Sequence, residues 1–247
     1  MTVADTVRIN KFLASTGAWS RRGSEALIEA GRVRIDGKVV REQGVQVDPD
    51  RHVVEVDGKR VEPSPLRWIA LHKPSAVICT RSDPRGRRTV YEHLKPEHEE
   101  LFHFGRLDFM SEGLVLLTND GDLAQALLHP SSEVRRRYAI TTHGPLPDGL
   151  AARLEEGVRL DDGLARAERV TVRPGDGPQQ NVVELTLREG RNREIRRMMK
   201  ALGIKIDALR RLSFGPIELG RLGPGRWRSL SPAEVRSLRK LAKRRKR

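Results

Sequence analysis

The stretch "GRLDFMSEGLVLLTNDGD", Gly105 to Asp122, sets a single carboxylate against apolar neighbours. Asp108 stands between Leu107 and Phe109, shortly before the apolar run 114–117. The apolar run predicts a buried strand, and the polar segment 106–113 before it predicts a loop. Because a carboxylate is costly among apolar groups unless it is paired or used, Asp108 requires an explanation.

Three interpretations of Asp108 are open from the residues alone. It can cap a turn or pair with Arg106, it can join Asp120 and Asp122 as a metal ligand, or it can act as a nucleophile or base positioned by a cation. The sequence has no EF-hand spacing, no HExxH motif and no recognisable histidine ligand spacing, which disfavours a metal site. A loop held between two strands is a common place for a catalytic residue.

The charge balance indicates a polyanionic partner. The 247 residues carry a formal net charge of +14, and the pI is near 10.7. Half of this excess lies in residues 233–247, which hold eight basic residues and one acidic residue. We interpret the excess as a sign of nucleic-acid binding. The basic tail is then either a sequence-independent phosphate anchor or simply a solvated segment.

Composition excludes several other classes of protein. The one cysteine, Cys79, excludes an intrachain disulfide and a cysteine-rich metal site. No apolar run approaches the ~18 residues that span a bilayer. The N-terminus lacks the apolar centre of a signal peptide. We therefore expect a cytoplasmic protein without a membrane partner.

Residues 1–61 are expected to form a small separate domain. Apolar spacing predicts one helix that ends at Gly17 and another over 21–30, with Ser20 as its N-cap. The segments "VRIDGKVV" (33–40) and "VEVDGKRV" (54–61) each alternate around Asp-Gly, which predicts two hairpins. The basic residues of this block form either a phosphate-binding face or an ordinary solvated one. The candidate RNA contacts are Arg8, Lys11, Arg21, Arg22, Arg32 and Arg34.

The rest of the chain is expected to form a larger domain. The two prolines of "EPSPL" (62–66) predict a linker, followed by a domain over 67–232 and a basic C-terminal helix and tail over 233–247. Strand-like pieces and helical patterns interleave irregularly, which predicts an α+β fold with a mixed, mainly antiparallel sheet and flanking helices. The predicted strands are 68–72, 101–104, 114–118, 137–142, 182–187 and 205–212, and the predicted helices are 121–128, 147–156, 191–202 and 232–242.

Three motifs in order resemble those of the RsuA/RluB type of pseudouridine synthase. The segment 105–121 is similar to the family's catalytic motif, and "EGRNREIRRMMKALG" (189–203) is similar to its arginine-rich helix. "VRRRYAI" (134–140) is similar to the segment that carries the family's tyrosine, with Arg136 where the family usually has lysine. Residues 8–40 resemble the small RNA-binding fold of ribosomal protein S four, which precedes the catalytic domain in this branch.

The resemblance implies an isomerisation of uridine in RNA that needs no cofactor or metal. The glycosidic bond breaks, the uracil rotates, and its C5 bonds to the ribose. Asp108 would be the essential carboxylate, Arg196 its partner, and Tyr138 the ring that stacks on the uracil. Whether Asp108 attacks C1′ or removes the C2′ proton stays open. Arg106 and Arg193 are further candidate RNA contacts.

Helical spacing divides the arginines of the predicted helix 191–202 between two faces. Arg193 and Arg197 share one face, and Arg196 and Lys200 share another. One face is then available to meet Asp108 while the other meets phosphate. An exposed basic helix without a specific role is the alternative for Arg193.

The resemblance also implies a substrate and a state of assembly. We expect ribosomal RNA, of the large subunit, or a ribosomal precursor particle as the partner, and a monomeric enzyme. Two other functions compete: a non-catalytic RNA-binding assembly factor on the same fold, and a metal-dependent nuclease that uses Asp108, Asp120 and Asp122. A binding factor would be expected to lose its active-site residues, yet Asp108, Tyr138 and Arg196 are all present.

Overall fold

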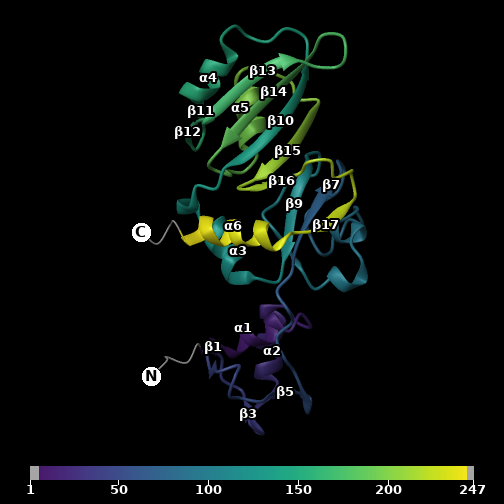
Figure 1. Ribbon diagram of the computed structural model, residues 1–247, viewed down its shortest axis with the longest axis vertical. Coiled ribbons are helices and arrows are strands. Elements are labelled where there is room, and N and C mark those ends of the chain that lie inside the picture. The colour runs from purple at the N-terminus through teal and green to yellow at the C-terminus, as the bar shows by residue number, and fades with distance from the viewer. Residues whose placement is uncertain (1–5, 244–247) are drawn as a thin grey trace. The chain divides into compact units, whose positions relative to one another are not determined.

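The computed structural model describes residues 6–243 and divides the chain into two compact units between Arg67 and Trp68 (Figure 1). The first unit contains the predicted linker 62–66, in which Ser64 hydrogen-bonds the carbonyl oxygens of Ser15 and Thr16. The second unit contains the predicted domain 67–232 except Arg67, and it also contains the C-terminal helix. Residues 1–5 and the last four of the basic tail lie outside the described residues.

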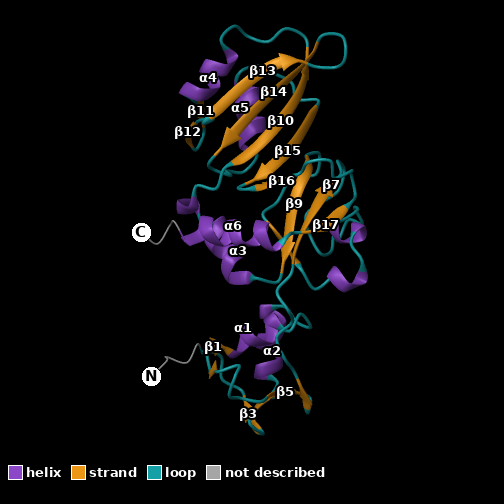
Figure 2. Cartoon of the chain, in the orientation of Figure 1, coloured by secondary structure: helices purple, strands orange, loops and turns teal. Residues whose placement is uncertain are grey.

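The first unit packs two helices over short strand pairs, as its sequence pattern predicts (Figure 2). Ser20 caps the second helix by accepting a hydrogen bond from the Gly23 N–H at 3.0 Å. Both Asp-Gly hairpins are present, and Asp36 and Asp57 take the left-handed backbone conformation that such turns need. The helices are α1 (Ile9–Ser15) and α2 (Arg21–Glu29), and the strands are β1 (Val7–Arg8), β2 (Val33–Ile35), β3 (Lys38–Val40), β4 (Gln46–Val47), β5 (Val54–Val56) and β6 (Lys59–Arg60).

The second unit is built on a mixed sheet of nine strands. Its main path runs β13-β14-β10-β15-β9-β7-β17, with β16 beside β15 and β8 beside β9. Every pairing is antiparallel except β15 with β9, so the predicted mixed, mainly antiparallel sheet is confirmed. The strands are β7 (Trp68–Lys73), β8 (Phe102–Phe104), β9 (Glu112–Thr118), β10 (Arg136–His143), β13 (Arg169–Pro174), β14 (Gln180–Leu187), β15 (Ala208–Phe214), β16 (Ile217–Glu218) and β17 (Trp227–Ser229).

Helices flank this sheet on its two faces, also as predicted. The apolar runs of β7 and β9 are buried on both sides: Ile69 and Leu117 pack in one core with α4 and α5, while Trp68 and Leu116 pack in another with α3 and α6. The helices are α3 (Gly121–Leu128), α4 (Leu150–Glu156), α5 (Glu194–Ala201) and α6 (Pro232–Lys243), with 3₁₀ turns η1 (Val90–His93), η2 (Pro96–His98) and η3 (Pro130–Ser132) and a short β11 (Val158–Leu160)–β12 (Gly163–Ala165) hairpin.

The parallel pairing of β9 with β15 depends on Gly113. This residue lies opposite Arg211, and a Cβ added to it would stand 2.4 Å from the Arg211 carbonyl oxygen. Its φ of +106° is also a conformation that side chains disfavour. The glycine in the opening stretch therefore lets two strands meet directly beside the turn that carries Asp108.

The C-terminal helix α6 is amphipathic rather than wholly solvated. Leu238 is fully buried against the core that α3 shares, with Val235 and Leu241 packed beside it. The described part of the predicted basic tail is therefore integral to the second unit. None of the helices in the described range is long and apolar enough to cross a bilayer.

Candidate active site

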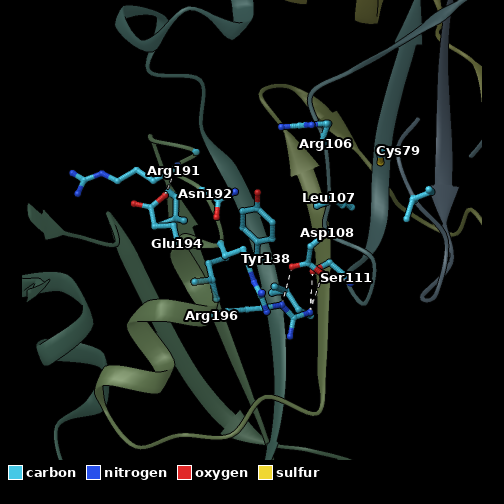
Figure 3. Close-up of a pocket in the computed structure, with 16 residues that line it drawn as sticks. Cys79, Arg106, Leu107, Asp108, Ser111, Tyr138, Arg191, Asn192, Glu194 and Arg196 are labelled. Atoms are coloured by element: carbon cyan, nitrogen blue, oxygen red, sulfur yellow. Dashed lines mark hydrogen bonds and ion pairs between the residues drawn. The ribbon is translucent and has the colours of Figure 1, made fainter. Parts of the chain in front are cut away.

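A pocket of about 490 Å³ opens where the turn before β9 faces the start of α5. Asp108 and Ser111 line one side, Tyr138 of β10 contributes to the wall, and Arg196 of α5 reaches across (Figure 3). The three residues that the resemblance implicates in catalysis are thus brought together. They come from segments far apart in the sequence.

Asp108 is held by a bidentate ion pair. Arg196 donates from Nε to Oδ2 at 2.7 Å and from a terminal nitrogen to Oδ1 at 3.2 Å, and a further N–H bond of that nitrogen reaches the Ser111 hydroxyl at 3.1 Å. The Ser111 N–H donates to Oδ1 at 2.8 Å. Asp108 thus closes a turn, as the structural interpretation expects, and a cation lies beside it, as a nucleophile or base would need. Its ion pair is with Arg196 and not with the predicted alternative, Arg106.

These contacts keep Asp108 ionised. Burial by itself raises the pKa of Asp108, but the hydrogen bonds from Arg196 and Ser111 and the positive charge of Arg196 outweigh it, so that the pKa lies below its usual value. The side chain keeps 28% of its exposure, which leaves an oxygen face accessible from the pocket. A half-buried, ionised carboxylate beside a guanidinium is suited to nucleophilic or basic chemistry.

Tyr138 is 9% exposed and lies in the middle of the sheet. Its strand pairs it with Leu185 on one side and Arg211 on the other, next to a register shift between Arg137 and Tyr138. Such irregularities are common beside active sites because they re-aim a side chain. Tyr138 thus packs in the core and also lines the pocket.

The start of α5 differs from the sequence prediction. The helix begins at Glu194, and Arg193 is its N-cap residue in the left-handed conformation, with φ +48°. The expectation that Arg193 shares a helix face with Arg197 was therefore wrong, because helical spacing does not extend through that turn. Arg193 is exposed at the pocket, while Arg197 forms an ion pair with Asp162 at 2.8 Å.

Glu194 closes the turn that precedes α5, a role that its sequence position did not reveal. It is 4% exposed, and its Oε2 accepts a hydrogen bond from the Arg191 N–H at 3.2 Å. Burial raises its pKa. The carboxyl therefore supports the loop that presents Asn192 and Arg193 to the pocket.

Lys73 is the most unexpected residue of the site. It ends β7 with no solvent exposure, and its Nζ donates to the carbonyl oxygens of Ser111 at 2.5 Å, Pro74 at 2.9 Å and Phe109 at 3.4 Å. Burial lowers the pKa of Lys73 to about 8, although nearby acidic groups, among them Asp108, oppose this shift. Through these hydrogen bonds the ammonium group holds the backbone of the turn that carries Asp108. The only sequence signal was a lysine followed by proline at the end of an apolar strand.

The predicted RNA contacts fall into two groups. Arg106 and Arg193 are exposed and line the pocket of the second unit. The others belong to the first unit, where Arg8, Arg21, Arg22 and Arg34 are exposed, Lys11 is half-buried, and Arg32 forms a bidentate pair with Asp57.

The carboxylates of the nuclease hypothesis, Asp108, Asp120 and Asp122, do not form a metal-binding cluster in the described part of the chain. Asp120 accepts a hydrogen bond from the Leu123 N–H at 3.1 Å and caps α3, whereas Asp108 faces the pocket. Within residues 6–243 no three His, Cys, Asp or Glu side chains are grouped as metal ligands.

Comparison with known proteins agrees with this arrangement. Residues 67–201 match the family model described as RNA pseudouridylate synthase, and residues 7–53 match the S4 domain. The chain belongs to the RNA pseudouridine synthase family, whose members are enzymes, and its first unit is an S4 domain. The resemblance seen in the sequence is thereby confirmed.

Individual relatives cover nearly the whole chain. An uncharacterized RNA pseudouridine synthase from Aquifex aeolicus (strain VF5) is 41% identical over 94% of this chain and 93% of its own length. The ribosomal large subunit pseudouridine synthase B of Bacillus subtilis (strain 168) is 38% identical over 95% and 96%. A crystal structure of a pseudouridylate synthase superposes with a TM-score of 0.65 at 27% identity, over 94% of this chain and 99% of that one.

Proposed function

We propose that this chain converts a specific uridine of large-subunit ribosomal RNA to pseudouridine, with Asp108 as the essential catalytic carboxylate. The observation that carries the proposal is the Asp108–Arg196 ion pair at the mouth of a pocket that also presents Tyr138. The substrate class is supported by the names of relatives such as the Bacillus subtilis enzyme.

Asp108 acts on the ribose of a uridine that has left its stack. Extrusion of a base costs a few kcal/mol, which contacts between basic side chains and phosphates offset. The ionised carboxylate either bonds to C1′ or removes the proton from C2′, and in both routes the bond from C1′ to N1 of the uracil breaks. The freed uracil turns and its C5 bonds to C1′. In the first route the bond from C1′ to the Asp108 oxygen breaks as this bond forms, and in the second route the carboxyl group returns its proton to C2′. The C5 proton then leaves and N1 takes up a proton.

Arg196 and Tyr138 have separate parts in this scheme. Arg196 keeps Asp108 ionised and oriented through two parallel hydrogen bonds. Tyr138 offers its ring as a stacking surface for the uracil, and its hydroxyl assists removal of the C5 proton late in the reaction. Arg106 and Arg193, exposed at the pocket, contact the RNA around the vacated position.

The first unit contributes affinity through its exposed arginines. Arg21 and Arg22 begin α2, where the helix N-terminus adds its own attraction for phosphate. Removal of residues 1–61 is therefore expected to weaken binding to ribosomal RNA while the chemistry at Asp108 persists. Unchanged RNA affinity after this truncation would contradict the assignment.

The decisive experiment measures tritium release from ribosomal RNA labelled at uridine C5, in the presence of a chelator. Wild type and Asp120→Asn, the matched control at a cap, are expected to release tritium, while Asp108→Asn is not. Large- and small-subunit RNA are offered separately, both naked and in precursor particles. Release only from small-subunit RNA would contradict the substrate assignment, and no release from any substrate would favour a non-catalytic RNA-binding factor.

A further inference from the structure

The turn that carries Asp108 has a second feature that the chemistry above does not use. The Ser111 N–H bonds back to the Asp108 carbonyl oxygen at 3.2 Å, and the Ser75 hydroxyl donates to the Met110 carbonyl oxygen at 3.2 Å. Lys73 donates to the carbonyl oxygens of Phe109 and Ser111. Every backbone carbonyl of the turn is thus held by a hydrogen bond.

This well-anchored turn exposes two large apolar side chains. Phe109 is 36% exposed and Met110 is 56% exposed, directly after the carboxylate. Of the other phenylalanines, Phe12, Phe104 and Phe214 are at most 3% exposed, and Phe102 is half-buried against a core. A single exposed apolar side chain needs no explanation. Two exposed neighbours on a turn anchored by hydrogen bonds, directly after the pocket residue Asp108, form a preorganised apolar surface, which we call the apolar turn.

An exposed arginine lies over the ring of Phe109, and further exposed arginines are close to these residues in the sequence. The Cζ atom of Arg87 lies 5.9 Å from the centre of the Phe109 ring, and both oxygens of Asp83 hold the Arg87 guanidinium at 2.9 Å. Arg85 and Arg88 of the same segment are exposed, as is Arg106 on the other side of Asp108. Apolar and aromatic groups interleaved with arginines suit a ligand that combines phosphates with stackable faces, namely single-stranded or opened RNA.

We propose that Phe109 and Met110 form a stacking platform for the nucleobase next to the target uridine. When the target leaves its stack to reach Asp108, the neighbouring base loses a partner. An apolar side chain fixed beside the carboxylate replaces that partner, so that binding favours the extruded state. This inference rests on the proposed function, since it names the RNA contact that accompanies extrusion.

Kinetics with the full-length protein and C5-tritiated ribosomal RNA give the first test. In Phe109→Ala we expect kcat/KM to fall about tenfold, mainly through a higher KM, because a stacked base contributes on this scale. Met110→Ala should fall less. The control is Val172→Ala, which trims a 43% exposed apolar side chain on strand β13 and should keep wild-type values. An unchanged KM in Phe109→Ala overturns the proposal.

Salt dependence separates stacking from charge. Phe109→Ala loses no phosphate contact, so the slope of log affinity against log salt should equal that of wild type, whereas Arg85→Ala should reduce the slope. A reduced slope in Phe109→Ala would show that the side chain acts on the arginines, and would overturn the stacking role.

A fluorescent variant reads the contact directly and separates the two proposals. Phe109→Trp keeps an aromatic ring, and the emission that it adds to the three native tryptophans should be quenched when ribosomal RNA binds. Quenching needs binding but not turnover. If the variant is quenched while wild type forms no pseudouridine, the platform stands and the proposed function fails. If wild type is active and the variant is not quenched, only the platform fails, and the apolar turn serves another partner such as a protein.

Discussion

The two ends of strand β9 carry carboxylates of opposite character. Asp120, after the strand, is 9% exposed, accepts a backbone N–H three residues ahead and lies 3.4 Å from Arg239 of α6. Asp108, before the strand, lines a pocket and is held by an arginine 88 residues away. Asp120, which accepts a hydrogen bond from the first turn of the helix that follows it, stabilises the fold. Asp108, which a distant arginine holds in the wall of a pocket, is available for chemistry.

The same substitution at both positions should separate these roles with the largest effect. Asp108→Asn keeps the size of the side chain but removes its charge, so the rate of tritium release is expected to fall by at least about a thousandfold. Asp120→Asn keeps a capping oxygen and should retain nearly full activity. The thermal midpoint of Asp120→Asn, measured alongside, should remain close to wild type, and that of Asp108→Asn should be lower because its ion pair with Arg196 is lost. Comparable activity losses in both would remove the distinction between the two ends.

Loss of the Arg196 guanidinium should change the pH dependence of activity, because it changes the pKa of Asp108. In Arg196→Met the carboxyl loses the hydrogen bonds and the positive charge of Arg196, while burial still acts on it, so its pKa should rise relative to wild type. The carboxylate is active when ionised, and activity is lost as the pH falls through this pKa. The acid limb of kcat/KM against pH should therefore move to higher pH. At its plateau the rate should be about ten- to a hundredfold below wild type.

The same pair has a linked effect on stability. Because the pKa of Asp108 is depressed by folding, the contribution of the ion pair is present above the ordinary aspartate pKa and is lost as the pH falls through the depressed value. Unfolding by urea at several acid pH values would measure this contribution to the free energy of unfolding.

The activity profile has its own contradicting outcome. If the acid limb of kcat/KM against pH stays in place in Arg196→Met, Arg196 does not control the ionisation of Asp108.

Removal of the lysine beneath the turn should cost both stability and activity. Lys73→Met leaves the carbonyl oxygens of Pro74, Phe109 and Ser111 without the Nζ donor. The bond to Ser111 is buried, and a buried acceptor left unpaired costs about 1–3 kcal/mol. Urea unfolding measures this loss. The rate should fall by about tenfold or more because the turn that carries Asp108 is less well fixed.

The lowered pKa of Lys73 also predicts that stability and activity change in opposite directions at alkaline pH. Its pKa in the folded protein is about 8, below the ordinary 10.5, so the folded state binds fewer protons between these values. The contribution of Lys73 to stability should therefore rise with pH in this window. Activity should fall over the same range, because a neutral amine has one N–H fewer for three carbonyl groups. Profiles of wild type and Lys73→Met that coincide would contradict both statements.

The smallest effect is expected at the helix cap. Asp120→Ala removes the acceptor for the Leu123 N–H, which should lower the free energy of unfolding by about 1 kcal/mol. The rate of tritium release at a temperature well below the unfolding transition should stay unchanged. A rate loss there, without a loss of stability, would assign Asp120 a part in the reaction.

Much of the local structure was predictable because its causes are local. The Asp-Gly pairs of the first unit predicted both hairpins, Ser20 predicted the start of α2, and the apolar run after Asp108 predicted β9. The predictions failed where local rules stop. Arg193 reads as helical from its spacing, yet the chain turns left-handed there. Strand β13 was missed because its alternation consists of only two apolar residues, Val170 and Val172, between polar ones.

By itself the sequence determined the order of the elements, the excess of positive charge and the three motifs that identify the family, since these depend on residue types at fixed spacing. Tertiary structure alone decided that Lys73 lies buried beneath the Asp108 turn, that Gly113 meets Arg211, and that Phe109 stays exposed. Each of these depends on which distant segments share a surface, and no spacing along one segment encodes the burial of another.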